Sequence, residues 1–252
     1  MKISAVIVTF NEEEKIADAI RSVAWADEIL VVDSESVDHT REIARELGAR
    51  VMIEKWRGFS GQKQFATDQA SNDHIFSLDA DERVSDRLKD EIVKIRDSGV
   101  TVDGYRIPRL STYLGREIHH SGWYPDWQLR FFDRTKGRWK DVAVHESIEM
   151  AEGATVSQLS GDILHFSIDS VKQHAEMIDT RYAPLSAQAM FDRGTRTSLL
   201  KIALSPVITF LQTYLIKLGV LDGFAGLVIS YFAAYNVFLK HLLLWERQNQ
   251  EK

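Results

Sequence analysis

The first hundred residues alternate between short apolar runs and stretches in which apolar residues recur every three or four positions. The runs at 3–8, 29–32, 51–53 and 74–78 have the length and composition of buried strands. The stretches that follow them predict helices with one apolar face. Strands that alternate with helices favour an α/β fold, in which helices cover both faces of a mostly parallel sheet.

Local signals at the helix ends refine this prediction. Asn11 followed by Glu14 has the spacing of a helix-capping pair, so we expect the first helix to begin there. A later helix is expected to begin near Ser85. Gly48 and Gly99 are placed to end the helices that precede them.

The rhythm changes after residue 100 to strand-like segments, which lie at 103–110, 113–118, 127–132 and 138–144. A turn at Lys136 and Gly137 is expected to join the last two segments into a hairpin. These segments predict an added mixed-sheet layer. A long helix is predicted after them, over 168–192.

The end of the chain is dominated by Leu, Ile, Val, Phe and Ala, in two segments at 199–221 and 224–245. A membrane span needs about 20 nearly uninterrupted apolar residues. Polar residues interrupt these segments, and they are Lys217, Asp222, Asn236, Lys240 and His241. We therefore expect amphipathic helices that lie in the plane of a membrane surface. A helical cap folded on the rest of the chain and a dimer surface are the alternatives.

The amino-acid composition limits the class of protein and the side chains available for catalysis. The chain has 252 residues, 44% of them hydrophobic and 27% charged, which is typical of a globular protein with one large core. With Cys 0, catalysis depends on carboxylates, hydroxyls, His and Lys rather than on thiolates. The first residues lack the pattern of a secretory signal peptide, so we expect a protein of the cytoplasm.

Charge is distributed unevenly along the chain. The formal net charge is -6, yet residues 195–252 hold 6 Lys and Arg against 3 Asp and Glu. The acidic body argues against binding to nucleic acid. An apolar and slightly basic tail suits an anionic membrane surface.

Polar residues follow three of the predicted strands at the point where each strand ends. They are Thr9-Phe10-Asn11, Asp33-Ser34-Glu35-Ser36 and Asp79-Ala80-Asp81. In an open α/β sheet, ligands bind outside the carboxyl ends of the strands. Two carboxylates in one loop are oxygen ligands of the kind that Mg²⁺ and Mn²⁺ prefer, and these ions bridge carboxylates to nucleotide phosphates. The alternative is that Asp81 and Glu82 only favour the start of the next helix.

Three segments carry a specific pattern, namely Val8-Thr9-Phe10-Asn11-Glu12, Val31-Val32-Asp33-Ser34 and Leu78-Asp79-Ala80-Asp81-Glu82. Later segments add to it, namely Gly122-Trp123-Tyr124-Pro125-Asp126, Gln128-Leu129-Arg130-Phe131-Phe132, Val144-His145-Glu146 and the stretch 206–226. The chain resembles the family-2 glycosyltransferases, which have the GT-A nucleotide-sugar fold, and within them the bacterial lipopolysaccharide core glucosyltransferases. The resemblance implies a GT-A domain over 1–194 and an apolar helical extension over 195–252.

The resemblance assigns the nucleotide base to the first two strand ends. Thr9, Phe10 and Asn11 would contact the nucleotide, with the Phe10 ring flanking the uracil. Asp33 would accept the imide proton of the base, because a carboxylate only accepts hydrogen bonds. The alternatives are that Phe10 belongs to the core and that Asp33 only caps its own turn. Glu35 stands where the family usually has glycine, and because Glu resists positive φ we expect this turn to differ.

Other residues are expected to bind the ribose, the metal and the diphosphate. By resemblance, Asp79 would face the ribose and Asp81 would hold a Mg²⁺ or Mn²⁺ ion. Asp79 and the imidazole of His145 are further candidate ligands of this ion. Lys63, which opens a predicted helix after a flexible loop, would meet the diphosphate or the acidic crevice. The forked donors of Arg130 suit phosphate charge. A Lys63 that only faces solvent is the alternative.

Inverting transfer needs a general base that deprotonates the acceptor hydroxyl. Asp126 is the first candidate, and Glu146 is the rival. For Asp126 the alternative is a turn cap or an ion pair with Arg130. His145 and Glu146 could equally form a surface pair, and His165 is a weaker candidate for the same site.

Together these observations predict an inverting, metal-dependent glycosyltransferase. It would move a hexose, with glucose the first candidate, from a UDP-sugar to a lipid-linked glycan such as the lipopolysaccharide inner core. It would act as a peripheral protein on the inner face of the cytoplasmic membrane. The alternative is a nucleotide-sugar-binding or membrane-scaffolding module that keeps the fold without turnover. The glycine-rich motif of dehydrogenases and the Gly-Lys-Ser/Thr of P-loop kinases are absent from the sequence, and the oligomeric state is not predicted.

Overall fold

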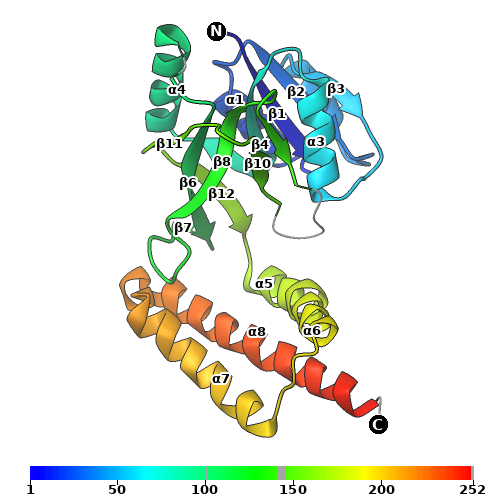
Figure 1. The fold of residues 1–252 in the computed structure, drawn as a ribbon, viewed down its shortest axis with the longest axis vertical. Helices are drawn as coiled ribbons and strands as arrows, with labels where there is room; N and C mark the ends of the chain where they lie inside the picture. Colours follow the sequence, from blue (N-terminus) through cyan, green and yellow to red (C-terminus); the bar gives the residue numbers. More distant parts are fainter. Residues whose placement is uncertain (100, 141–145, 251–252) are drawn as a thin grey trace. The chain divides into compact units, whose positions relative to one another are not determined.

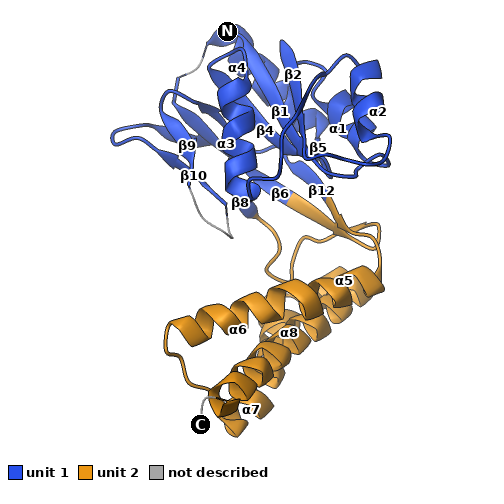
Figure 2. Ribbon diagram, turned by 90° about the vertical axis from the view of Figure 1, so that its right-hand side faces the viewer, with its two compact units in different colours: residues 1–109, 126–165 blue, residues 110–125, 166–252 orange. Residues whose placement is uncertain are grey.

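The computed structural model describes residues 1–99, 101–140 and 146–250. The chain divides into two compact units, drawn in blue and orange in Figure 2. The first unit consists of residues 1–109 and 126–165, and the second of residues 110–125 and 166–252. This division follows the packing of the chain, whereas the expected boundary after residue 194 follows composition and function and stays a prediction.

A mixed sheet forms the centre of the first unit. Four neighbouring strands run parallel, in the order β3 (Arg50–Ile53), β2 (Glu28–Asp33), β1 (Ile3–Thr9) and β4 (His74–Asp79). The order continues through β8 (Asp126–Asp133), β6 (Gly104–Tyr113), β12 (Ile163–Ile168) and β5 (Glu82–Val84). β8 is antiparallel to both β4 and β6. The predicted fold class, a mostly parallel mixed sheet flanked by helices, is confirmed.

Helices cover both faces of this sheet, as Figure 1 shows. One core contains apolar side chains of β1 and β4 together with those of α1 (Ile16–Ser22), α2 (Thr40–Glu46) and α4 (Asp86–Ser98). The other core packs the opposite side chains of the same strands against α3 (Phe59–Gln69). Within β1, Ile7 belongs to the first core and Val6 to the second, because successive side chains of a strand point to opposite faces.

The helix-end predictions are confirmed in part. The Ser85 hydroxyl caps α4 by accepting a hydrogen bond from the Leu88 amide, and Gly99 ends that helix. The capping pair predicted for the first helix is wrong, because α1 begins only at Ile16 and has no side-chain cap. Asn11 instead takes a φ of 53°, which its short polar side chain tolerates.

The predicted hairpin across Lys136 and Gly137 is also wrong. Strand β9 (Gly137–Trp139) pairs with β10 (Ile148–Met150) in a separate two-stranded sheet, and not with β8. A Cβ at Gly137 would come within 2.7 Å of the Met150 sulfur, so this glycine serves close strand packing rather than a turn. The predicted strand over 138–144 falls in part outside the described residues. Two short strands, β11 (Val156–Gln158) and β7 (Arg116–Glu117), pair with β6.

The second unit is largely helical. The long helix predicted over 168–192 is confirmed as α5 (Val171–Met177) and α6 (Ala183–Asp192), joined by a π-helical turn. The apolar tail forms α7 (Leu199–Leu211), continued by a π-helical turn to Ile216, and α8 (Gly223–Gln250). The stretches Leu199–Ile216 and Gly219–Gln250 are each long and apolar enough to cross a membrane, and little of either is buried.

Candidate active site

The carboxyl ends of three neighbouring strands meet at one edge of the first unit. Thr9 at the end of β1 lies opposite Asp33 at the end of β2, and Val8 lies opposite Asp79 at the end of β4. The polar residues that the sequence placed after these strands therefore share one edge, as expected for a parallel sheet.

Three buried polar atoms at the ends of β1 and β2 lack a hydrogen-bond partner in the described part of the chain. They are the Thr9 hydroxyl, the Ser34 hydroxyl and the Oδ1 atom of Asp33. Asp33 is completely buried, and its other oxygen accepts a hydrogen bond from the Ser36 amide at 2.9 Å. A buried polar group left unpaired costs about 1–3 kcal/mol. Asp33 thus does cap its own turn, but the turn uses only one of its oxygens.

The turn after Asp33 keeps the backbone conformation that a glycine would give. Glu35 has a φ of 63°, so the expectation that this turn differs because Glu resists positive φ was wrong. A non-glycine residue in this region carries strain of order 1–3 kcal/mol, and such strain clusters at functional sites. Two hydrogen bonds hold the neighbouring loops together: the Asn11 amide donates to the Ser36 hydroxyl at 2.8 Å, and the Val37 amide donates to the Asn11 side chain at 2.9 Å.

Phe10 lies beside this turn and is 55% exposed. The alternative that Phe10 belongs to the core is therefore wrong. An exposed aromatic ring next to unpaired buried acceptors offers a flat apolar surface beside hydrogen-bonding groups, which is the chemistry that a planar base requires.

Asp79 is held by two buried cations. The Lys63 ammonium lies 2.9 Å from its Oδ1 atom, and Nη2 of Arg130 donates to its Oδ2 atom at 3.0 Å. Burial alone would raise the pKa of Asp79, but the charges and hydrogen bonds of Lys63 and Arg130 outweigh it and hold the pKa well below its usual range. Lys63 is therefore buried against the acidic crevice, and the alternative that it only faces solvent is wrong.

Glu146 joins the same cluster from the other side of Lys63. Its Oε1 atom lies 3.4 Å from the Lys63 ammonium, which also lies over the Trp139 ring. This contact places the rival base beside the expected diphosphate region. The neighbouring His145 lies outside the described residues, so its role as a metal ligand stays a prediction.

A network of hydrogen bonds and ion pairs connects Asp79 to Asp126. Glu82 is completely buried, accepts the Asp79 amide at 3.0 Å and lies 3.1 Å from Nη2 of Arg130. Arg109 donates to Glu82 at 3.3 Å and to Oδ2 of Asp126 at 2.9 and 2.6 Å. The ion pair of Asp126 with Arg130, expected as an alternative, is therefore wrong: Asp126 pairs with Arg109, and Arg130 pairs with Asp79 and Glu82.

Asp81 has a different environment from Asp79. Its Oδ2 atom lies 3.3 Å from Nε2 of His165, which β12 places opposite Glu82 in β5. Burial raises the pKa of the Glu12 carboxyl group, and the charge of Asp81 raises it further. A partly exposed carboxylate, an imidazole and a further carboxyl group fit the ligand chemistry of a divalent cation. Within the described ranges, no group of three or more such side chains is arranged to hold a metal by itself.

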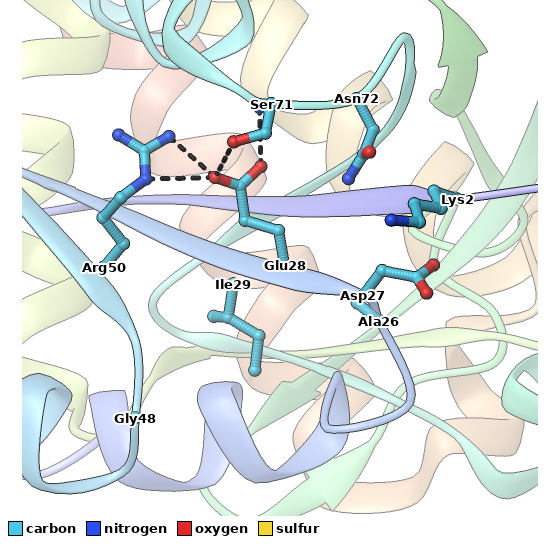
Figure 3. Close-up of a pocket in the computed structure, with 9 residues that line it drawn as sticks. All are labelled: Lys2, Ala26, Asp27, Glu28, Ile29, Gly48, Arg50, Ser71 and Asn72. Atoms are coloured by element: carbon cyan, nitrogen blue, oxygen red, sulfur yellow. Dashed lines mark hydrogen bonds and ion pairs between the residues drawn. The ribbon is translucent and has the colours of Figure 1, made fainter.

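A pocket of about 520 Å³ lies at the opposite edge of the sheet, where β1, β2 and β3 begin (Figure 3). Glu28 lines this pocket. The oxygens of Glu28 accept hydrogen bonds from Arg50 at 2.7 Å and from the Ser71 amide at 2.7 Å. Burial alone would raise the pKa of Glu28, but hydrogen bonds from Ser4, Ser71 and Arg50 lower it to about 2. Because its oxygens are already paired, this cluster holds loops together rather than awaiting a ligand.

Sequence reasoning missed two of the residues that organise the crevice. It considered Glu82 only as a favourable charge at a helix start, and it did not consider Arg109. Arg109 follows Pro108 within a strand that is otherwise mostly buried, and an arginine at such a position is a signal for a buried ion pair.

Comparisons with known proteins show what the chain is similar to. Residues 4–151 match the model of the family described as glycosyl transferase family 2. The chain is 29% identical to the lipopolysaccharide core biosynthesis glycosyltransferase LpsC of Rhizobium meliloti, over 96% of this chain and 94% of LpsC. It is 32% identical to an uncharacterized glycosyltransferase of Rickettsia felis, over 95% of this chain and 88% of that protein.

One solved structure shows the same fold. It is the mannosyltransferase PcManGT from Pyrobaculum calidifontis, in complex with GDP-Man and Mn²⁺. The TM-score is 0.53 and the identity 16%, with 98% of this chain and 88% of PcManGT covered. The likeness covers the whole chain and concerns the fold alone.

Proposed function

The chain belongs to glycosyl transferase family 2, and from this premise we propose that it transfers a hexose from a UDP-sugar, with inversion, to a lipid-linked glycan. Glucose is the first candidate for the hexose. The lipopolysaccharide inner core is the first candidate for the acceptor, because LpsC is named for core biosynthesis. The reaction would take place at the cytoplasmic face of the inner membrane.

The observation that carries this proposal is the set of unpaired polar atoms at the carboxyl edge of the sheet. The free Oδ1 atom of Asp33 suits the imide N–H of uracil, and the exposed ring of Phe10 suits its face. The hydroxyls of Thr9 and Ser34 would each gain a partner from the nucleoside. Binding would thereby relieve a cost that the free protein carries.

A divalent cation, Mg²⁺ or Mn²⁺, would stabilise the negative charge that develops on the departing diphosphate. Asp81 and His165 would hold it, with Glu12 close by. Because few protein ligands are available there, nucleotide phosphates would complete its coordination. Asp79 would face the ribose or assist the metal, while Lys63 and Arg130 hold its carboxylate in place.

Asp126 is the proposed general base for the acceptor hydroxyl. The Arg109 fork and Gln128, which donates to its Oδ1 atom at 2.7 Å, fix the orientation of its carboxylate. A carboxylate oxygen has two acceptor positions, so these bonds leave room for the proton of an attacking hydroxyl. The side chain is 36% exposed, as access by an acceptor requires.

A membrane-borne acceptor is supported by the apolar tail. Exposed apolar side chains recur along α7 and the π-helical turn that continues it, at Leu200, Leu204, Ile208, Leu211 and Leu215. They recur along α8 at Phe224, Leu227, Tyr231, Phe238 and Leu242. This spacing places a stripe along one side of each helix. Soluble surfaces rarely carry so much contiguous apolar area, so the stripes favour contact with lipid.

A transfer assay tests the proposal. Purified protein is incubated with Mn²⁺, a panel of radiolabelled nucleotide sugars, and membranes whose lipopolysaccharide is truncated at the inner core. We expect label from UDP-glucose in the lipid-linked fraction, and no transfer of label when the reaction contains EDTA. Failure of every UDP-sugar to label that fraction or to be hydrolysed would instead favour a binding module without turnover.

A further inference from the structure

Two segments of the second unit are fastened together by one buried carboxylate. We call residues 114–122 the clamp loop and residues 217–224 the hairpin turn, which connects α7 to α8. Asp222 accepts hydrogen bonds from the amides of His119 and His120 at 3.2 Å each, from His120 Nδ1 at 3.0 Å and from the Ser121 hydroxyl at 3.0 Å. Four donors from the clamp loop thus converge on one side chain of the hairpin turn.

The hairpin turn is itself rigidly built. A Cβ at Gly226 would come within 1.8 Å of the Gly219 carbonyl oxygen, so the start of α8 lies in backbone contact with the turn. The Ser121 amide also donates to the Lys217 carbonyl at 2.8 Å. Ser121 and Leu218, neither of them glycine, have φ values of 60° and 56°. Such strain persists only where the surroundings fix the backbone, and it marks functional segments.

The outer surface of the hairpin turn is apolar. Leu218, Val220, Leu221 and Phe224 are all exposed, and Leu221 and Phe224 are 63% and 71% exposed. Asp222 is the acidic residue within this turn, and it is buried. Its charge is directed inward to the clamp loop, which leaves the outer surface without an acidic group.

Cations from both segments lie next to this apolar surface, Arg116 from the clamp loop and Lys217 from the hairpin turn. Arg116 and Lys217 are both exposed. Nη1 of Arg116 lies 3.7 Å from the position of a Cβ at Gly223, and the Lys217 side chain lies against Gly122. His119 adds a further nitrogen, and Glu117 lies 3.3 Å from it. Cations next to exposed apolar side chains match the boundary between lipid phosphates and acyl chains.

We propose that the clamp loop and the hairpin turn together form a docking element for an anionic phospholipid leaflet. Leu221 and Phe224 enter the acyl region, while Arg116 and Lys217 meet the phosphates. Asp222 holds the two segments in register, so that the cations stay at headgroup depth. The inference rests on the membrane part of the proposed function, and it assigns that contact to a defined element that includes residues from the middle of the chain.

Liposome flotation tests the proposal with the full-length protein. The probes are vesicles of phosphatidylcholine alone and vesicles with phosphatidylglycerol added. We expect binding to the anionic vesicles, a loss of about tenfold or more for Leu221→Asp with Phe224→Asp, and about fivefold for each of Arg116→Glu and Lys217→Glu. Val156→Asp, at an exposed apolar residue of β11 in the first unit, is the matched control and should float like the wild type.

Asp222→Asn tests the clamp itself and should weaken flotation, with circular dichroism to confirm folding. The surface variants keep the proposal falsifiable if this variant does not fold. Equal flotation of the wild type and the three surface variants (the double apolar variant, Arg116→Glu and Lys217→Glu) would overturn the proposal. A wild-type dimer that these variants convert to monomer would also overturn it, because the occupant of this surface would then be a second copy of the chain. UDP-sugar hydrolysis in solution separates the two claims: it should be unchanged in the surface variants, and its absence from the wild type would count against the proposed function alone.

Discussion

Carboxylates at the two edges of the same sheet differ in how completely their oxygens are hydrogen-bonded. At the amino edge, Glu28 receives hydrogen bonds from Arg50, Ser71 and Ser4. At the carboxyl edge, Asp33 is completely buried, more deeply than the partly exposed Glu28, but one of its oxygens has no partner in the described part of the chain. A fully paired cluster stabilises the fold by itself, whereas an incompletely paired one lowers stability until a ligand binds.

This contrast distinguishes residues that stabilise the fold from residues that bind a ligand. A pocket is present at the amino edge, yet the oxygens of Glu28 within it are already paired. The carboxyl edge combines unpaired acceptors, backbone strain at Glu35 and an exposed aromatic ring. Substitutions at the first edge should therefore reduce stability and spare activity, and substitutions at the second should do the reverse.

Asp81→Asn should have the largest effect. Loss of a charged metal ligand removes several kcal/mol of stabilisation from the diphosphate in the transition state, so kcat/KM should fall by about 10³-fold or more. The transfer assay at several Mn²⁺ concentrations measures this effect. Asp97→Asn changes an exposed aspartate of α4 and is the matched control, with no expected loss. Normal Mn²⁺-dependent transfer by Asp81→Asn would remove Asp81 from the metal site.

Asp126→Asn should lower kcat by about 10²- to 10⁴-fold, the usual contribution of a general base, and leave UDP-sugar affinity unchanged. The amide keeps the shape of the side chain but cannot accept the hydroxyl proton. Single-turnover kinetics together with calorimetry of donor binding separate the two quantities. Full transfer by this variant would move the base to Glu146, for which Glu146→Gln is the next variant.

Asp33→Asn should weaken UDP binding by about 10- to 150-fold, because a hydrogen bond to a charged acceptor contributes about 1.5–3 kcal/mol. The free energy of unfolding should stay equal or rise, since the variant removes a buried charge with an unpaired oxygen. Calorimetry and urea unfolding measure the two quantities. A stability loss of 2 kcal/mol or more would show that Asp33 serves the fold instead.

Glu28→Gln should lower the free energy of unfolding by about 2 kcal/mol at neutral pH, after allowance for solvent screening, with unchanged kcat. The pKa of Glu28 is lowered to about 2 from an ordinary value of 4.5. Its contribution is therefore present above pH 4.5 and is lost as the pH falls towards 2. Unfolding curves between pH 7 and 3 should show a smaller acid sensitivity in the variant.

Thr9→Val is the matched change at the other edge. It removes a buried hydroxyl that lacks a partner, so it should raise stability by about 1 kcal/mol and weaken UDP binding. If Thr9→Val destabilised the protein as much as Glu28→Gln does, the contrast between the two edges would not hold.

Much of the fold follows from the sequence because periodicity reports burial. The runs that became β1, β2 and β4 are buried on both faces, and such strands appear as continuous apolar segments. The cap at Asn11 and the hairpin at Gly137 could not be predicted, because distant partners decide both. Asn11 binds the loop after β2, and Gly137 makes room for Met150 from β10.

In the candidate site, too, the features set by strand periodicity were predictable, and those set by distant partners were not. Thr9, Asp33 and Asp79 were predicted to share one edge because parallel strands end together, and the register of the sheet confirms this. The partners of Asp79 and Asp126 were not predictable, because Lys63, Arg130 and Arg109 reach them from α3, β8 and β6. Pairing of side chains across a mixed sheet depends on strand order, which periodicity alone does not give.

Calorimetric titration of UDP into the protein, with and without Mn²⁺, tests the central claim most directly. The account predicts binding that Mn²⁺ strengthens by at least about tenfold and that Asp33→Asn weakens in both conditions. Equal affinity with and without the metal, or affinity that Asp33→Asn leaves unchanged, would contradict it.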